Sequence, residues 1–115
     1  MAPCVKTVLE VGEKLVKKSP ANHQRGIETV GGMLYLTTAR LIFESHALNI
    51  QTGVTIVSIS EINRLRKEWT KFLNVIPIFP NTLAVTSSSG HEDKFILFRR
   101  TPWINEINKL KEGQN

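Results

Sequence analysis

Cysteine is almost absent from this sequence, since Cys4 is the only one among 115 residues. A lone thiol excludes an intramolecular disulfide framework and any zinc or iron–sulfur site built from several cysteines. Long apolar runs are also missing, and none approaches the roughly 20 residues that a membrane-spanning helix needs. The first residues do not place an apolar stretch behind a basic one, so we expect no secretory signal and a cytoplasmic location.

Catalytic and metal-binding signatures are missing as well. The three histidines, His23, His46 and His91, lack metal-ligand spacing, and Asp93 is the only aspartate. No Gly-x-Ser-x-Gly sequence holds a nucleophilic serine, and no glycine-rich loop joins a strand to a helix. We therefore expect no enzymatic activity, no bound metal and no cofactor. We expect His23 and His46, which end two of the strands predicted below, to be hydrogen-bonded structural residues rather than ligands of a shared metal.

The residues that are present have the composition of one small globular domain. Hydrophobic residues make up 41% and charged residues 22%, which argues against disorder. We expect a lead-in segment over 1–12, a single domain over 13–111 and a tail over 112–115. The net charge of +5 favours acidic partners, although it also serves solubility alone. Nucleic acid is a weak candidate, because the cations do not alternate with exposed aromatic side chains.

Alternating apolar and polar residues predict a chain made mainly of β-strands. The clearest pair is joined by Thr38 and Ala39, and a link this short predicts a hairpin. The turn at 88–92 predicts a second hairpin, and Pro20 and Gly26 predict a loop over 20–26. The predicted strands cover 13–19, 29–37, 40–45, 54–59, 81–87 and 94–99.

The C-terminal residues change to the period of a helix. Thr101 can cap this helix, and Pro102 suits its first position. The apolar residues then fall on one stripe of about three turns. We expect Trp103, Ile104, Ile107 and Leu110 to bury this stripe against Leu34, Leu36, Phe43 and Phe95.

Residues 60–76 fit two structures from their pattern alone. In the first, a cationic amphipathic helix carries Ile62, Leu65, Trp69, Phe72, Leu73 and Ile76 on its apolar stripe. In the second, a strand over about 61–68 is followed by an apolar loop that Pro77 and Pro80 close. Periodicity by itself favours the helix.

Three stretches of the chain resemble a known family. They are Ala21-Asn-His-Gln-Arg-Gly-Ile-Glu28, Val30-Gly-Gly-Met-Leu-Tyr-Leu-Thr-Thr-Ala-Arg-Leu-Ile-Phe43 and Ser45-His-Ala-Leu-Asn-Ile-Gln51, which together look like a GRAM domain. The resemblance covers roughly 13–111 and implies a mainly β, pleckstrin-homology (PH)-like fold. That fold is a seven-stranded antiparallel barrel of two orthogonal sheets, capped by a C-terminal α-helix.

The resemblance also bears on two local questions. It implies a strand over about 61–68, followed by an insertion over 69–79 in which a helical turn can form. It implies a structural role for Arg40, which we expect to tie the hairpin turn to a backbone carbonyl or a nearby carboxylate.

In this superfold some members bind inositol phospholipids and many bind proteins. Two basic sets are candidates for contacts with an anionic ligand, although neither matches the dense basic pattern of phosphoinositide-binding members. The second set lies beside an apolar insertion, an arrangement that suits contact with lipid headgroups. The candidate anion contacts are Lys17, Lys18 and Arg25 in the first set, and Arg64, Arg66, Lys67 and Lys71 in the second. The candidate membrane or interface contacts are Trp69, Phe72 and Phe79.

We therefore expect a non-catalytic binding module that attaches to an anionic membrane surface or phospholipid headgroup. It would be cytoplasmic, with peripheral contact at the inner membrane face at most. The alternative is a protein-interaction or self-assembling scaffold domain that uses an apolar face, because open strand edges favour pairing into a homodimer.

Overall fold

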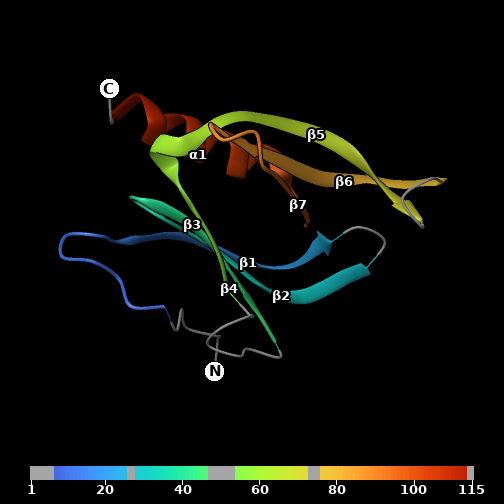
Figure 1. The fold of residues 1–115 in the computed structure, drawn as a ribbon, viewed down its shortest axis with the longest axis horizontal. Helices are drawn as coiled ribbons and strands as arrows, with labels where there is room; N and C mark the ends of the chain where they lie inside the picture. The colour runs from blue at the N-terminus through green and yellow to red at the C-terminus, as the bar shows by residue number, and fades with distance from the viewer. Residues whose placement is uncertain (1–6, 26–27, 47–53, 73–75, 114–115) are drawn as a thin grey trace.

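The computed structural model describes residues 7–25, 28–46, 54–72 and 76–113. Seven strands and a short 3₁₀ segment are followed by one helix (Figure 1). Their bounds are β1 Leu15–Arg25, β2 Glu28–Thr37, β3 Arg40–Ser45, β4 Val54–Ser58, η1 Ile59–Glu61, β5 Ile62–Phe72, β6 Ile76–Ser87, β7 Glu92–Ile96 and α1 Arg100–Gly113.

All seven strands belong to one antiparallel sheet with the order β4-β3-β2-β1-β7-β6-β5. Figure 1 shows this sheet bent over on itself, with β1–β4 below β5 and β6, and with α1 beside the upper strands. Among the residues described, the end strands β4 and β5 do not pair with each other. The expected closed barrel is therefore wrong for this structure, and its division into two orthogonal sheets stays a prediction.

Most of the predicted elements are confirmed. The strands predicted over 29–37, 40–45 and 54–59 correspond to β2, β3 and β4, and the C-terminal helix is present. The strand implied for about 61–68 is present as β5, which runs on to Phe72. The amphipathic helix over 60–76 is therefore wrong. The backbone of Ile62–Phe72 pairs with β6, whereas a helix would need hydrogen bonds between residues of the same segment.

Three predicted boundaries are wrong. The loop expected over 20–26 is strand up to Arg25, because β1 pairs with β2 along this whole stretch. Pro20 is tolerated there because it pairs only with β2, and β7 joins β1 from Asn22 onward. The insertion over 69–79 is largely the extended end of the β5–β6 hairpin, and β7 stops at Ile96 instead of Arg99.

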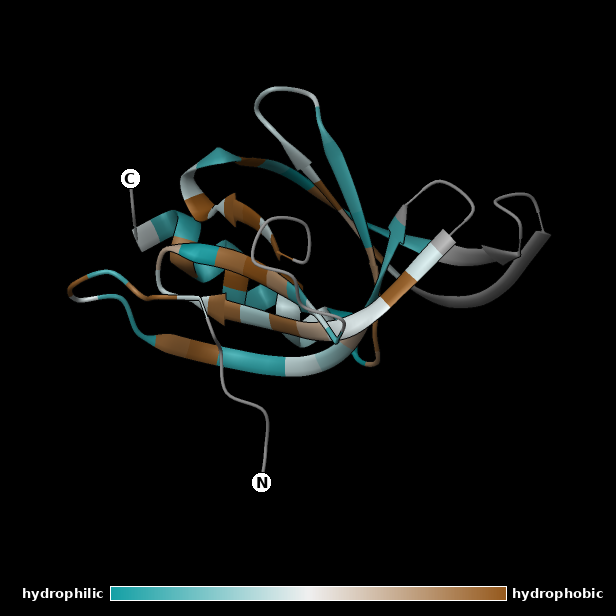
Figure 2. Ribbon diagram, turned by 60° about the horizontal axis from the view of Figure 1, so that its bottom comes forward, coloured by the Kyte–Doolittle hydropathy of each residue, from teal (hydrophilic) through white to brown (hydrophobic). Residues whose placement is uncertain are grey.

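The core lies inside the bend of the sheet. Alternate side chains of β1 point into it. Figure 2 shows brown, hydrophobic stretches along the strands that surround the core, interrupted by teal and white ones. From α1, Trp103 and Ile107 are fully buried in the core, and Ile104 and Leu110 pack against it partly buried. The predicted helix face is confirmed, since the same cluster contains Leu34, Leu36, Phe43 and Phe95.

A second, smaller apolar cluster lies on the other face of β2 and β3. Met33, Tyr35 and Ile42 form it, and Leu9 from the lead-in segment packs against them. The backbone N–H and hydroxyl of Thr7 also donate hydrogen bonds to the buried Glu44 carboxylate, at 2.7 and 2.6 Å. The described part of the lead-in segment thus packs on this face of the sheet and is hydrogen-bonded to it.

Arg40 holds the β2–β3 turn to the lead-in segment. Its guanidinium donates to both carboxylate oxygens of Glu13, at 2.8 and 2.9 Å, and to the carbonyl of Val8 at 3.0 Å. The carboxylate of Glu13 is almost fully covered. The structural role predicted for Arg40 is confirmed, and it contacts both kinds of acceptor that were expected.

This ion pair predicts a defined pH dependence of stability. The hydrogen bond from Arg40 lowers the pKa of Glu13 from 4.5 to about 2. Because the folded pKa lies below the unfolded one, the ionised carboxylate stabilises the fold above about pH 4.5, and this stabilisation is lost as the pH falls towards 2. We expect Glu13→Gln to cost about 1–3 kcal/mol at pH 7 and to flatten the acid limb of the stability curve.

The measurement is urea unfolding at a series of pH values between 2 and 7. Glu112→Gln is the matched control, because Glu112 is an exposed carboxylate near the end of α1. A Glu13→Gln protein with the stability and pH profile of the wild type would show that this ion pair contributes nothing to the fold.

Candidate functional site

The basic residues of β5 whose side chains the structure describes, Arg64, Arg66 and Lys67, differ in their surroundings. The Arg66 guanidinium is 2.5 Å from a Glu92 oxygen and 2.7 Å from a Glu68 oxygen. The Lys94 ammonium lies 3.1 Å from the same Glu68 carboxylate. The hydrogen bond to Glu92 is the main reason that the pKa of Arg66 is raised, and it also lowers the pKa of Glu92. Arg66 is therefore neutralised within the sheet, and its selection as an anion contact is not supported by this geometry.

The other predicted cations of β5 are separated from one another. The Lys67 ammonium donates to the Thr101 hydroxyl at 2.6 Å, which joins β5 to the start of α1. Arg64 is exposed towards the opposite end of the strand. Lys71 lies on the β5 backbone, but its side chain is outside the described residues, as are the side chains of Trp69, Phe72 and Phe79. Their roles as membrane or interface contacts stay predictions.

The first basic set lies on β1. Lys17 is half-buried, and its ammonium lies 5.8 Å from the ring centre of Trp103, an arrangement that suits a cation–π contact. Lys18 is exposed on the other face of the strand. Arg25 is the last residue of β1, and its side chain is outside the described residues. Of the two described side chains in this set, that of Lys18 is the more exposed.

The histidines are arranged differently from one another. His23 is buried, bonds to the Asp93 carboxylate at 3.0 Å and stacks on Phe95 at 4.9 Å. Burial by itself would raise the pKa of Asp93, but the hydrogen bonds and charges of His23 and His91 outweigh it and lower that pKa. The structural role predicted for His23 is confirmed. Among the described residues, no group of three His, Cys, Asp or Glu side chains is placed to hold a metal.

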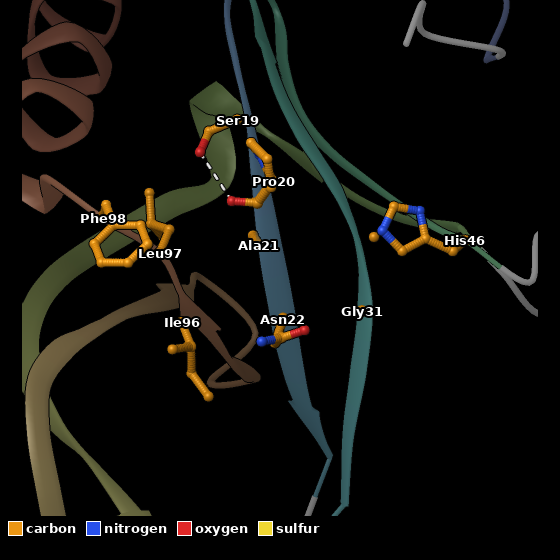
Figure 3. A pocket seen from close by; sticks show the side chains of 10 residues that line it. Ser19, Pro20, Ala21, Asn22, Gly31, His46, Ile96, Leu97 and Phe98 are labelled. Carbon is orange, nitrogen blue, oxygen red and sulfur yellow. Dashed lines mark hydrogen bonds between the residues drawn. The ribbon is translucent and has the colours of Figure 1, made fainter. Parts of the chain in front are cut away.

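A hollow of about 410 Å³ lies between β1 and the residues that follow β7 (Figure 3). It forms because the pairing of β7 with β1 stops at Ile96 opposite Asn22, after which the chain leaves the sheet. Leu97 turns inward and is buried, whereas Phe98 is 84% exposed. The hollow is lined by Ser19, Pro20, Ala21, Asn22, Gly31, Gly32, His46, Ile96, Leu97 and Phe98.

The Phe98 surface consists of Val16, Lys18, Pro20, Phe98 and Arg99. Alternation along β1 places Lys18 on the same exposed face as Pro20, which lines the hollow together with Phe98. Val16 is also exposed, at a shift in the β1–β2 register between Leu15 and Lys17. Arg99 follows Phe98, is exposed and has a φ of 58°, which turns the chain into α1. The surface thus combines exposed apolar side chains with cations.

Lys18 is one of the contacts predicted from the sequence, whereas Phe98 and Arg99 are not. The alternation predicts a strand over 94–99, with Phe98 on the face opposite Phe95 and Leu97. The signal in the sequence was the run Phe98-Arg99-Arg100 directly before the helix cap, since two cations there are not typical of a buried strand. His46 lines the same hollow, with an exposed side chain, and its structural role stays a prediction.

Comparison with solved structures shows the same fold elsewhere. The C-terminal domain of an unknown protein from Leishmania infantum superposes with a TM-score of 0.67 at 17% identity, covering 88% of this chain and 85% of that chain. The Vps36 N-terminal PH domain superposes with a TM-score of 0.57 at 18% identity, covering 91% of this chain and 81% of that chain. These likenesses establish a PH-like fold. No curated protein matches the sequence.

The sequence itself carries a family signature. The sequence model of the GRAM domain matches residues 3–112, which is nearly the whole chain. The match includes the segment from Gly32 to Phe43, which forms β2, the tight turn and β3. The chain therefore belongs to the GRAM domain family.

Proposed function

We propose that this chain is a non-catalytic binding module that attaches peripherally to an anionic membrane surface on the cytoplasmic side. GRAM and PH-like domains are binding modules for membranes, lipids or proteins. The observation that carries the proposal is Phe98, a large aromatic side chain that is 84% exposed beside the cation Arg99. Among the described residues, no helix is long and apolar enough to cross a membrane. The contact that we propose is at the level of the headgroups.

The chemistry of the Phe98 surface suits this contact. An aromatic ring at the interface gains free energy by burying its apolar face, and each nearby cation adds about 1 kcal/mol against anionic lipid. Val16 adds exposed apolar area on β1, and Lys18 adds a cation. The net charge of +5 attracts the whole domain towards such a surface before contact.

The test is co-sedimentation with phosphatidylserine-containing vesicles. We expect Lys18→Glu combined with Phe98→Ser to weaken binding roughly 100-fold, because one cation and one aromatic insertion are lost. The matched control is Lys109→Glu combined with Ile56→Ser, which reverses one lysine and replaces one large apolar residue by serine at exposed positions away from this surface. Equal binding by both double variants would reject the Phe98 surface as the contact.

The projecting end of the β5–β6 hairpin remains the second candidate surface for the same function. It carries Lys71, Phe72 and Phe79, and Figure 1 shows β5 and β6 reaching the same end of the molecule as β1 and β2, where Arg25 lies. Lys71→Glu combined with Phe72→Ser tests this surface in the same assay. A loss of binding in this variant alone would keep the membrane function and move the contact to the hairpin.

A protein-interaction or self-assembling scaffold is the alternative function. An exposed aromatic residue such as Phe98 can equally pack against a second protein. The two functions respond differently to salt, because membrane attraction is screened whereas an apolar interface is not. Vesicle binding that is unaffected by salt, or no vesicle binding together with dimers in sedimentation, would favour the scaffold.

A further inference from the structure

The outer edge of β4 is an unpaired strand edge. In the described residues, β4 pairs only with β3. The Ile59 N–H donates to the Ala39 carbonyl at 2.9 Å, in the same register as the β3–β4 pairs. In an antiparallel strand, the backbone N–H and C=O groups of successive residues point alternately towards the paired strand and away from it. The N–H of Ile59 points towards β3, so the backbone groups of Val54, Ile56 and Ser58 point away from it.

A groove of about 310 Å³ runs between this edge and the turn that joins β6 to β7. From β4 the groove is lined by residues 55–58, and on its other side lie Glu61, His91 and Asp93 with two serines. Glu61 is exposed, whereas Asp93 is buried and bonded to His23 and His91. Among the residues that the structure describes, the lining contains two carboxylates and neither lysine nor arginine.

Nothing in the sequence of β4 blocks a further strand. The strand reads Val-Thr-Ile-Val-Ser, with no charge and no proline, and Ile56 at its centre is 45% exposed. Free edges are usually protected by charged residues, proline or bulges. The other end strand, β5, does carry such protection, since it contains Arg64, Arg66 and Lys67 and has shifts in its register.

We propose that this groove binds an extended peptide with basic side chains, which adds to the free edge of β4 as an eighth strand. The backbone groups of Val54, Ile56 and Ser58 would supply the hydrogen bonds of this strand addition. Side chains of a strand alternate between its two faces. A basic residue on one face would meet Glu61 across the groove, and an apolar residue on the other face would pack beside Ile56.

This site is distinct from the membrane contact proposed above. In the sheet order, β3 and β2 separate β4 from β1, which carries Lys18 of the Phe98 surface. The charge of the groove is also opposite in sign to that surface, because its ionised groups are carboxylates. A domain held at a membrane through Phe98 therefore keeps a separate groove for a peptide.

The first test uses a fluorescein-labelled heptapeptide of alternating valine and lysine, with fluorescence anisotropy as the readout. We expect the wild-type protein to bind it and Glu61→Lys to weaken binding at least about tenfold. Glu112→Lys, the same charge change at an exposed position of α1, should leave binding unchanged. Equal binding of a valine–glutamate peptide, or an unchanged affinity in Glu61→Lys, would overturn the charge argument and with it the proposal.

The second test concerns the strand edge. Ile56→Pro removes an N–H that points into the groove and leaves the β3 ladder intact, whereas Ile56→Ala keeps that N–H. We expect only the proline variant to lose the peptide, with circular dichroism and thermal melting confirming that both variants are folded. Retained binding in a folded Ile56→Pro protein would overturn strand addition, as would wild-type dimers that ignore the peptide and become monomers on this substitution.

Binding of the same variants to phosphatidylserine vesicles separates this proposal from the proposed function. We expect Glu61→Lys and Ile56→Pro to bind vesicles at least as well as the wild type. Vesicle binding lost together with peptide binding would show that the two sites are one, and would overturn a separate peptide groove.

Discussion

Replacing Trp103 by alanine is expected to lower the free energy of unfolding by about 3–5 kcal/mol. Trp103 is 1% exposed and is the largest fully buried side chain among the described residues. Its indole fills the core between α1 and the bent sheet, so its removal leaves a cavity that the surrounding strands cannot close. Urea unfolding followed by circular dichroism measures this loss.

Asn105→Ala is the matched control, because Asn105 is an exposed residue of the same helix and alanine favours helix. Its stability should stay within about 0.5 kcal/mol of the wild type. A Trp103→Ala protein that melts like the wild type would contradict the packing of α1 against the core.

Replacing Gly32 by alanine is expected to destabilise the fold by about 3 kcal/mol or more, because the extra carbon has no space. A Cβ at Gly32 would lie 2.2 Å from the carbonyl oxygen of Glu44 and 2.7 Å from Cα of Ser45. These are backbone atoms of β3, the partner strand of β2, so β2 and β3 would have to separate. Thermal melting and chemical unfolding measure the effect.

The neighbouring residue Gly31 provides the control. A Cβ there would meet the side chains of Asn22 at 3.2 Å and His46 at 3.5 Å, and both side chains lie at the open hollow beside β1. We expect Gly31→Ala to cost less than about 1 kcal/mol. If both glycine variants were equally stable, the close approach of β2 and β3 at Gly32 would be wrong.

The sequence predicts those parts of the fold that local pattern determines. The alternating pattern locates β2 and β3, although both faces of these strands are buried, and the stripe that contains Trp103 and Ile107 locates α1. The family resemblance adds β5, which periodicity alone assigns to a helix. It also adds the role of Arg40, whose partner Glu13 is far away in the sequence.

The parts that could not be predicted depend on strand register and strand ends. Arg66 looks like a free cation in the sequence, and only the β5–β6–β7 register brings Glu92 to its guanidinium. Phe98 is exposed because β7 ends at Ile96, three residues earlier than its pattern indicates. The unpaired edge of β4 exists because the two end strands, β4 and β5, do not pair with each other in the described residues. No local sequence pattern predicts this.

The most direct test of the central claim is sedimentation of the wild-type protein with two kinds of vesicles at low salt. One kind contains phosphatidylserine and the other contains phosphatidylcholine alone. Our account predicts that the protein sediments with the anionic vesicles, stays in solution with the neutral ones, and is released as salt is raised. Wild-type protein that remains in solution with both kinds at low salt would contradict a membrane-binding function.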